Sequence, residues 1–271
     1  MGSDYANIYF DDNMNVLNEM KSGSVNLVYV DPPFNTGKIQ SRKRLETVRS
    51  EDGDRIGFKG HRYKTKVLSE QSFFDIYDDY IRFLRHRIEQ TERVLTSDGS
   101  FFLHLDYREI HYAKVMCDEV FGRESFINEI IWSYDYGGRS KSRWSAKHDN
   151  ILWYAKDPKN FTYRYDDIDR IPYMAPGLVG AEKASKGKTP TDSWWHTIVS
   201  PNGKEKTGYP TQKPLGIINR IIRVHSNPGD VILDYFAGSG TTGIAALAEG
   251  RKAILVDNNH QALEVMCKRF D

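Results

Sequence analysis

"DYFAGSGTTG", residues 234–243, places three glycines with GxGxxG spacing between an expected strand and an expected helix. Glycines at such a turn let the backbone approach a ligand, and a carboxylate at the end of the next strand, here Asp257, can bind ribose hydroxyls. The pattern favours a βαβ nucleotide site, and without GK[ST] it is not a P-loop. By itself it also allows NAD. A tight turn without a ligand, with Asp257 as a helix N-cap, stays open.

The position of this stretch limits the topology. Only 14 residues follow Asp257, which is enough for one helix and for no further strand. The other strands of the sheet must therefore come from the N-terminal part of the chain, so we expect a circularly permuted fold. The strand that ends before Asp31 then lies beside the nucleotide-binding strands, at the crevice where open α/β sheets bind ligands.

Strands and helices alternate along most of the chain. Helices are expected at 73–95, 107–120, 215–225, 241–249 and from 260, and strands at 25–30, 100–105, 150–155, 231–234 and 253–256, with a turn at 97–99. This alternation predicts a parallel sheet. Between 133 and 209 the alternation weakens, which indicates an inserted lobe or long loops.

Composition excludes several classes of protein. Hydrophobic residues make up 39% and aromatic residues 13%, which excludes a disordered chain, and the longest apolar runs are too short to cross a bilayer. The N-terminus lacks the pattern of a signal peptide, and the two cysteines, Cys117 and Cys267, have no CxxC spacing. We expect a soluble, cytoplasmic protein without a zinc site.

Formal net charge is +1, but the charge is unevenly distributed. Residues 38–66 hold ten Lys or Arg against four acids. A solvated surface loop and a loop that contacts phosphates explain this run about equally well.

The basic run directly follows "VYVDPPFNTG", residues 28–37. Here a buried strand leads into an acid, two prolines and an aromatic ring. Pro33 fixes its own φ and restricts Pro32 to an extended conformation, so the backbone after Asp31 is held still. A strand-end turn with a packed Phe34 is the alternative interpretation.

Taken together, these motifs resemble the permuted, beta-group DNA amino-methyltransferases that use S-adenosylmethionine, in which a DPPY/F motif precedes an FxGxGT motif. Further matching stretches are "FFLHLDYREIHYAKVMCDEVFG" (101–122), "HDNILWYAK" (148–156) and "GYPTQKPLGIINRII" (208–222). The likeness covers nearly the whole chain. It implies a Rossmann-like methyltransferase fold with a mostly parallel seven-stranded sheet and helices on both faces, in a bacterial, archaeal or phage-encoded protein. It divides the chain into a catalytic half (1–132), a target-recognition region (133–209) and a cofactor-binding half (210–271).

The resemblance assigns roles to the first motif. Asp31 and the Pro32 carbonyl would accept the two N–H bonds of an exocyclic amine, with Pro33 holding that carbonyl and Phe34 stacking on a flipped-out base. No metal is required. An aspartate at the start of the motif favours adenine N6 over cytosine N4, where serine is usual.

The resemblance also implies a set of cofactor-binding residues. They are Asp12, Asp31, Thr211, Gln212, Lys213, Asp234, Phe236, Ala237, Gly238, Ser239, Gly240, Thr241 and Asp257. Either Asp11 or Asp12 could take the N-terminal position, because the glycine that usually precedes the family's aspartate is missing. Lys213 could instead be a solvated cation where a helix begins.

Double-stranded DNA is the implied partner, and a homodimer and a cognate restriction endonuclease are further family-level expectations. Candidate DNA contacts are Lys38, Arg42, Lys43, Arg44, Arg139, Lys141 and Arg143. A solvated charged loop explains the last three about as well. His104 is more often a core residue than a base, and Trp194 and Trp195 more often pack a small core than contact DNA.

Two other functions stay open from the sequence. One is an NAD-dependent oxidoreductase built on the glycine loop. The other is a DNA-binding subunit with degenerate catalysis, although the motif residues are intact.

Overall fold

The computed structural model describes residues 2–3, 6–36, 38–49, 52, 55–56, 62–75, 79–200 and 202–271. The chain forms two compact units. The larger comprises Met1–Pro32 and Asp79–Asp271, and the smaller comprises Pro33–Asp78. Asp31 and the glycine loop both belong to the larger unit.

Nine strands of the described residues form one sheet in the larger unit. Across the sheet they are β1 (Gly2–Ser3), β2 (Ala6–Phe10), β12 (Lys252–Asp257), β11 (Val231–Asp234), β3 (Val25–Val30), β7 (Leu95–Leu105), β9 (His148–Ala155), β8 (Phe126–Ser133) and β10 (Ser193–Trp195). The strands from β2 to β8 run parallel except β9, which is antiparallel to both its neighbours. The mostly parallel sheet of seven main strands is confirmed, and β1 and β10 add short edges.

The two ends of the chain meet in the middle of this sheet. β11 pairs with β3, through Ile232 and Leu27, and β12 pairs with β2 along its whole length. The expectation that N-terminal strands complete the sheet around the C-terminal strands is confirmed. Asp31 is therefore carried by the strand next to the one that leads into the glycine loop.

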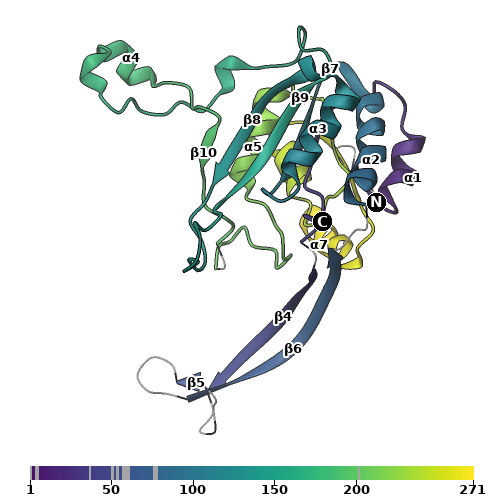
Figure 1. Ribbon diagram of the computed structural model, residues 1–271, viewed down its shortest axis with the longest axis vertical. Coiled ribbons are helices and arrows are strands. Elements are labelled where there is room, and N and C mark those ends of the chain that lie inside the picture. The colour runs from purple at the N-terminus through teal and green to yellow at the C-terminus, as the bar shows by residue number, and fades with distance from the viewer. Residues whose placement is uncertain are drawn as a thin grey trace. The chain divides into compact units, whose positions relative to one another are not determined.

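Helices cover both faces of the sheet (Figure 1). One layer consists of α1 (Asn13–Glu19), α2 (Tyr80–Val94) and α3 (Ile110–Phe121), and the other of α5 (Leu215–His225), α6 (Thr241–Ala248) and α7 (His260–Phe270). Apolar faces of the second layer pack on the sheet, with Ile218 and Ile222 of α5 buried against Leu27 and Ile232. Burial of such side chains is the main stabilising contribution to the fold.

The segment at 38–75 differs from the expectation. It forms an antiparallel sheet of β4 (Lys38–Arg49), β6 (Arg62–Asp75) and β5 (Arg55–Ile56) in the order β4-β6-β5, where a loop was expected. The helix expected from Phe73 begins at Tyr80 instead, because Phe73 and Phe74 pair in β6 and the Asp79 carboxylate caps the helix by accepting from Arg82 N at 2.9 Å. The many charged residues of this segment hide its strand pattern.

The expected turn at Ser97–Gly99 is also wrong, since β7 runs through it. The pairing register between β3 and β7 shifts there, between Val25 and Leu27. A Cβ at Gly99 would lie 2.9 Å from the Asn26 carbonyl oxygen, so only glycine lets the strands approach.

Residues 133–209 are less regular, as expected. Besides β9 and β10 they contain α4 (Ala181–Lys186) and the 3₁₀ turns η3 (Tyr165–Asp167) and η4 (Pro176–Leu178), and a further 3₁₀ turn, η2 (Arg123–Ser125), precedes β8. α4 projects from the body of the larger unit in Figure 1. Trp194 packs into the main core under the Arg220 guanidinium, whereas Trp195 is exposed. The two tryptophans therefore do not form a separate core together.

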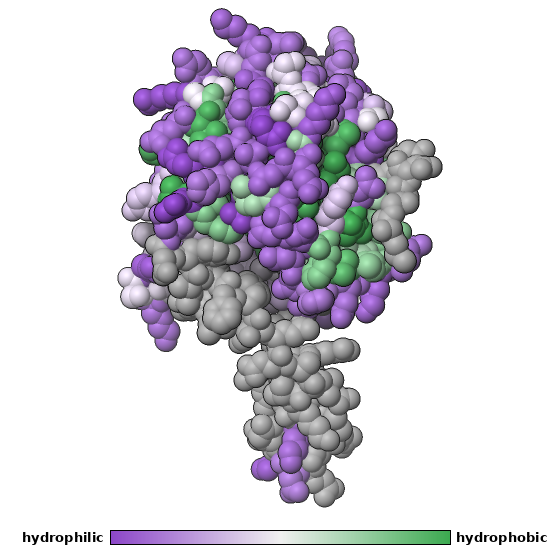
Figure 2. Space-filling model, turned by 90° about the vertical axis from the view of Figure 1, so that its right-hand side faces the viewer, coloured by the Kyte–Doolittle hydropathy of each residue, from purple (hydrophilic) through white to green (hydrophobic). Residues whose placement is uncertain are grey.

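The face of the larger unit shown in Figure 2 is mainly hydrophilic, with apolar residues in small separate patches. Such a mixture is usual for a surface that faces water. In the part of the chain that the structure describes, no helix is both long and apolar enough to cross a membrane.

His225 makes stability depend on pH. It is buried against Trp153 and Phe102, with ring centroids at 4.3 and 4.9 Å, and burial lowers its pKa to about 3. Because this pKa lies below the ordinary value, protonation opposes folding, and stability is lost as pH falls from about 6.5 toward 3. Relative to His225→Phe, the wild type should lose roughly 1.4 kcal/mol of unfolding free energy per pH unit below 6.5. Urea unfolding of both proteins at pH 7.5 and 5 tests this prediction. An equal change in unfolding free energy between the two pH values in both proteins would contradict it.

Candidate active site

Three carboxylates lie at one edge of the sheet. Asp31 directly follows β3, Asp234 ends β11 and Asp257 ends β12. These strands are parallel neighbours, so their carboxyl ends meet where open α/β sheets bind ligands. Within the larger unit, the structure thus brings Asp31 to the same sheet edge as the glycine loop.

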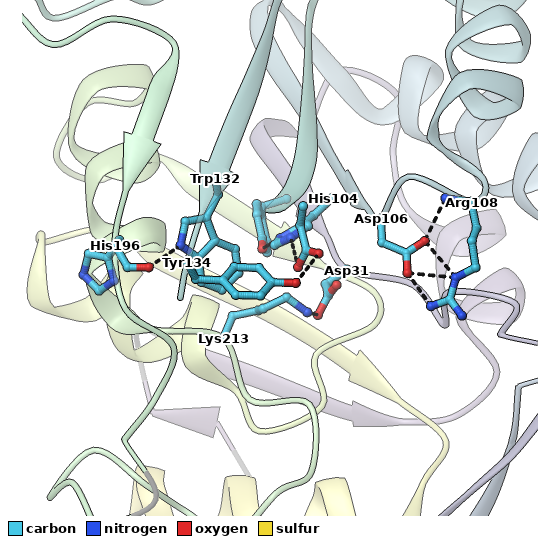
Figure 3. Close-up of polar contacts among 10 residues, drawn as sticks. Asp31, His104, Asp106, Arg108, Trp132, Tyr134, His196 and Lys213 are labelled. Carbon is cyan, nitrogen blue, oxygen red and sulfur yellow. Dashed lines mark hydrogen bonds and ion pairs between the residues drawn. The ribbon is translucent and has the colours of Figure 1, made fainter. Parts of the chain in front are cut away.

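The two carboxylate oxygens of Asp31 lie in different surroundings. Its Oδ2 accepts a hydrogen bond from Lys213 Nζ in an ion pair whose side chains are only 15% and 13% exposed (Figure 3). Its Oδ1 is buried and has no hydrogen-bond partner among the described residues. A buried acceptor without a donor is costly unless a ligand supplies one. Asp31 is therefore built to accept an N–H or O–H group at Oδ1.

Lys213 is held by the loop that precedes α5. The Gln212 side chain accepts from Thr207 N and Oγ1 at 2.8 and 2.9 Å and donates to the Glu205 carbonyl, and Glu205 accepts from Leu215 N at 2.5 Å. These bonds fix the backbone on both sides of Lys213. The interpretation of Lys213 as a solvated cation is wrong, because it is largely buried and paired with Asp31.

A cavity of about 360 Å³ opens beside Lys213. Its lining consists of Trp132, Tyr134, Tyr136, Asp149, Ile198, Val199, Lys206, Tyr209, Pro210, Thr211, Gln212 and Lys213. Four aromatic rings with one carboxylate and two ammonium groups, of which Lys213 is paired with Asp31, suit a flat, polar-edged molecule such as a nucleobase.

A buried hydrogen-bond chain runs from the core to this cavity (Figure 3). Tyr29 Oη lies 2.7 Å from His104 Nδ1, His104 Nε2 lies 3.2 Å from Asp149 Oδ2, and Tyr134 Oη donates to Asp149 Oδ1 at 3.1 Å. Burial acts to raise the pKa of Asp149, but the His104 hydrogen bond and the charge of Lys213 outweigh it and lower that pKa. His104 is thus a fully satisfied core residue, as expected, and Asp149 reaches the cavity as a carboxylate.

Asp106, which directly follows β7, forms an ion pair with Arg108. Both its oxygens accept from the Arg108 guanidinium. Of the two carboxylates that directly follow β3 and β7, only Asp31 keeps an oxygen without a partner among the described residues.

Asp234 supports the glycine loop from beneath. Its Oδ1 accepts from Phe236 N at 3.0 Å and its Oδ2 from Thr242 Oγ1 at 2.6 Å. Burial raises the pKa of Asp234 to about 7, and the nearby carboxylates of Asp31 and Asp257 act in the same direction. With both oxygens occupied, Asp234 shapes the loop.

Gly238 is the glycine nearest to the site. Its φ is +50°, its N–H donates to Asp257 Oδ2 at 2.8 Å, and a Cβ there would lie 3.0 Å from the Tyr209 ring. Burial raises the pKa of Tyr209, and the charges of Asp257 and Asp31 add to this. The Tyr209 ring lies against Gly238 and also lines the cavity. The loop, Tyr209 and Asp257 therefore fit a cofactor that binds across the ends of β11 and β12.

Gly240 and Gly243 serve packing. A Cβ at Gly240 would lie 2.9 Å from Met266, and one at Gly243 would lie 2.6 Å from Leu255 and Phe270. These glycines let α6 pack closely on α7 and β12, and so set the angle at which the loop leaves the sheet.

The other predicted cofactor residues surround this loop. Ala237 N donates to the Val256 carbonyl at 3.1 Å, and the buried hydroxyls of Ser239 and Thr241 lie 3.0 Å apart. Phe236 packs against Phe83 with ring centroids 6.1 Å apart.

Asp12 and Thr211 are more exposed. Asp12 follows β2, beside β12, and caps α1 by accepting from Met14 N at 2.8 Å. Asp11 Oδ1 accepts from Asp12 N and Asn15 Nδ2, so both acids stand at the same sheet edge. Thr211 lines the cavity.

The candidate DNA contacts fall into two groups. Lys38, Arg42, Lys43 and Arg44 lie in β4 of the smaller unit, and their side chains are outside the described part of the structure. Pro33 and Phe34 begin the same unit. Arg139, Lys141 and Arg143 lie in the loop between β8 and β9, where Arg139 pairs with Asp135.

Sequence reasoning missed Asp149 and Tyr209. Asp149 and Tyr209 lie within the matching stretches at 148–156 and 208–222. That signal marks the stretches but not which side chain faces the site, since this depends on the pairing of β9 with β7 and β8.

Lys213→Met should lower kcat about a hundredfold and change cofactor affinity much less. Without the ammonium, the largely buried Asp31 carboxylate loses the group that orients and compensates it. Lys206→Met is a matched control, because Lys206 lines the same cavity and no ion pair to a described residue is seen for it. Single-turnover methyl transfer with calorimetric titration of the cofactor measures both quantities, and equal losses in the two variants would refute the role given to Lys213.

The glycine loop, the Asp31 oxygen without a partner among the described residues and the aromatic cavity fit the class of enzymes that bind a cofactor and a flat substrate with an N–H or O–H donor. The sequence model of the N6_N4_Mtase family of DNA methylases matches residues 25–268, and the chain belongs to this family. The resemblance seen in the sequence is confirmed.

Known relatives agree with this assignment. The chain is 29% identical over 283 residues to the DNA adenine methyltransferase YhdJ of Escherichia coli K12, covering all of this chain and 84% of that protein. The fold is similar to that of M1.HpyAVI in its SAM complex, with a TM-score of 0.62, 21% identity, and coverage of 98% of this chain and 99% of the other. It is also similar to the cytosine-N4-specific PvuII DNA methyltransferase, with a TM-score of 0.66, 16% identity, and coverage of 98% and 86%.

Proposed function

We propose that this protein transfers the methyl group of S-adenosylmethionine to the exocyclic N6 of an adenine flipped out of double-stranded DNA. One observation carries the proposal. Asp31 presents a buried, unsatisfied Oδ1 at the sheet edge shared with the glycine loop, while Lys213 holds its Oδ2. An amine placed there meets an oriented acceptor next to the cofactor loop.

The reaction needs an acceptor because the lone pair of the adenine amine is delocalised into the ring. Asp31 Oδ1 accepts one N–H and the Pro32 carbonyl accepts the other, which favours a localised lone pair on nitrogen. Lys213 keeps the carboxylate in one orientation, so little reorganisation is needed during transfer. Once the amine nitrogen has accepted a methyl group, one of its protons would leave to water.

When bound, S-adenosylmethionine supplies an electrophilic methyl group on a sulfonium. The residues present fit it, because Gly238 leaves a cradle beside Tyr209 that a Cβ would narrow. Phe236, Gly238 and Gly240 would hold its methionine part, Asp257 the ribose hydroxyls and Asp12 its adenine. Thr211, Gln212, Lys213 and Pro214 would border it. These assignments follow the family motif residue by residue.

Two features support adenine over cytosine. Asp31 opens the DPPF motif, and YhdJ, which is named an adenine methyltransferase, is similar over the whole chain. Cytosine N4 is the second candidate, because the structure of the PvuII cytosine-N4 enzyme is also similar.

Residues 133–209 and the smaller unit are proposed to contact DNA and to choose the target site. Arg139, Lys141 and Arg143 would contact phosphates, and Lys38 with Arg42, Lys43 and Arg44 would add a second basic stretch. A homodimer and a cognate restriction endonuclease are further proposals, tested by solution mass and by endonuclease protection of methylated DNA.

Incubation with labelled S-adenosylmethionine and duplex DNA, followed by nucleoside mass spectrometry, tests the proposal. Label in N6-methyladenine is expected. Label in N4-methylcytosine would refute the assignment of adenine as the target base. Binding of the cofactor without transfer to any DNA would refute the proposed activity. Calorimetry with NAD covers the oxidoreductase alternative, which requires binding of NAD and none of S-adenosylmethionine.

A further inference from the structure

The loop at 134–147, here called the β8–β9 loop, stands at the catalytic edge of the sheet. Tyr134 N donates to the Lys147 carbonyl at 2.9 Å and closes the loop directly beyond the last β8–β9 pair, Ser133 with His148. Its foot reaches the aromatic cavity, because Tyr134 and Tyr136 both line it. Whatever the loop contacts therefore lies next to the base that the cavity would hold.

The loop has a defined shape. Ser140 N donates to Ser145 Oγ at 2.7 Å, which brings the two sides of the tip together. Lys147 Nζ donates to the Tyr136 carbonyl near the foot. Arg139 pairs with Asp135 within the same loop. The tip is thus held by its own side chains.

Trp144 lies at this tip with its side chain 99% exposed. Trp132, Trp153 and Trp194 are buried, and Trp195 is 69% exposed. A large aromatic ring left wholly in water contributes nothing to folding. The whole ring is therefore available for contact with a partner.

The surroundings of Trp144 indicate the partner. The loop holds Arg139, Lys141, Arg143 and Lys147 against the single acid Asp135. No ion pair to a described residue is seen for Lys141 or Arg143, and Arg143 directly precedes the tryptophan. A flat ring between cations matches a phosphate backbone with stacked bases, rather than an apolar protein groove.

We propose that Trp144 inserts into the base stack of duplex DNA and fills the place that the flipped-out adenine leaves, while Lys141 and Arg143 neutralise the flanking phosphates. This inference rests on the proposed function. Extruding a base loses its stacking and pairing, and an inserted side chain restores part of the stacking. The distance along the chain fits, since the same short loop lines the cavity at its foot and carries the ring at its tip.

The test compares Trp144→Ala with Trp195→Ala, the other exposed tryptophan, which has no Lys or Arg within residues 189–199. The substrates are two unmodified duplexes that contain the DNA sequence this protein methylates. In one the target adenine is paired, and in the other it lies opposite an abasic site. An unpaired adenine costs less to extrude, so it needs the wedge less. Trp144→Ala should lower kcat/KM at least tenfold on the paired duplex and less than threefold on the unpaired one, and Trp195→Ala should change neither.

A second readout does not depend on methyl transfer. When 2-aminopurine replaces the target adenine, binding of the wild type should increase the fluorescence of the 2-aminopurine. With saturating Trp144→Ala, most of that increase should be absent. Lys141→Gln with Arg143→Gln should instead weaken binding to both duplexes alike and reduce its salt dependence.

Three outcomes overturn the inference. They are an equal loss on both duplexes, no loss on either, and an unchanged 2-aminopurine signal in Trp144→Ala. If the wild type itself neither methylates DNA nor changes the 2-aminopurine signal, the proposed function fails and the inference falls with it. If the wild type methylates DNA and Trp144→Ala gives one of these three outcomes, the inference about Trp144 is wrong and the proposed function stands.

Discussion

Asp31→Ala should lower methyl transfer to DNA at least a thousandfold, which corresponds to about 4 kcal/mol of transition-state stabilisation. The loss follows because, of the two described carboxylates that directly follow β3 and β7, only Asp31 keeps an oxygen without a partner among the described residues. Affinity for S-adenosylmethionine should stay within about threefold, because the glycine loop and Asp257 are untouched. Single-turnover kinetics and calorimetry measure the two effects separately.

Two variants sharpen this prediction. Asp31→Asn keeps the shape but loses the charge that pairs with Lys213, and it should also be severely impaired. Asp106→Asn changes a carboxylate at a neighbouring strand end whose oxygens are held by Arg108, and it should lose less than tenfold. An active Asp31→Ala enzyme, or an equally large loss in Asp106→Asn, would contradict the mechanism.

Gly238→Val should weaken binding of S-adenosylmethionine at least a hundredfold. A Cβ at this position lies 3.0 Å from Tyr209, and the two further methyl groups would fill the space between the loop and that ring. The positive φ of +50° adds backbone strain of about 1–2 kcal/mol. Calorimetric titration of the cofactor gives the affinity, and urea unfolding gives the cost in stability.

Gly250→Val is the matched control. Gly250 also has a positive φ, +73°, but nothing lies within 4 Å of its Cβ position, and it follows the C-cap of α6, away from the ligand edge. It should lose a similar amount of stability and keep its cofactor affinity. If both variants bind the cofactor equally well, Gly238 does not border the cofactor.

The architecture of the larger unit follows from local sequence signals. The glycine loop between β11 and α6 marks the C-terminal strands of the sheet, and the apolar runs of β3 and β2 pair beside these strands. Burial on both faces gives these parallel strands continuous apolar runs that can be read without an alignment.

The sheet at 38–75 could not be predicted in the same way. Its strands carry many charged residues, so neither the period of a strand nor that of a helix stands out. Pairing of β4 with β6 is a long antiparallel match between segments that look like a basic loop. The late start of α2 has the same origin, because Phe73 and Phe74 fit a helical period but pair in β6 instead.

The site was only partly visible in the sequence. Asp31 and the glycine loop stand out by residue type, but the ion pair between Asp31 and Lys213 joins residues 182 positions apart. Similarly, the position of Asp149 between His104 and Tyr134 depends on how β9 pairs with its neighbours. Contacts of this kind arise from topology, and no local pattern encodes them.

Methylome sequencing of a host that expresses this chain, beside one that expresses Asp31→Ala, tests the central claim most directly. The account predicts N6-methyladenine at one recurring DNA sequence with the wild type and none there with the variant. The same modified sites in both hosts, N4-methylcytosine in place of N6-methyladenine, or no new modification would contradict it.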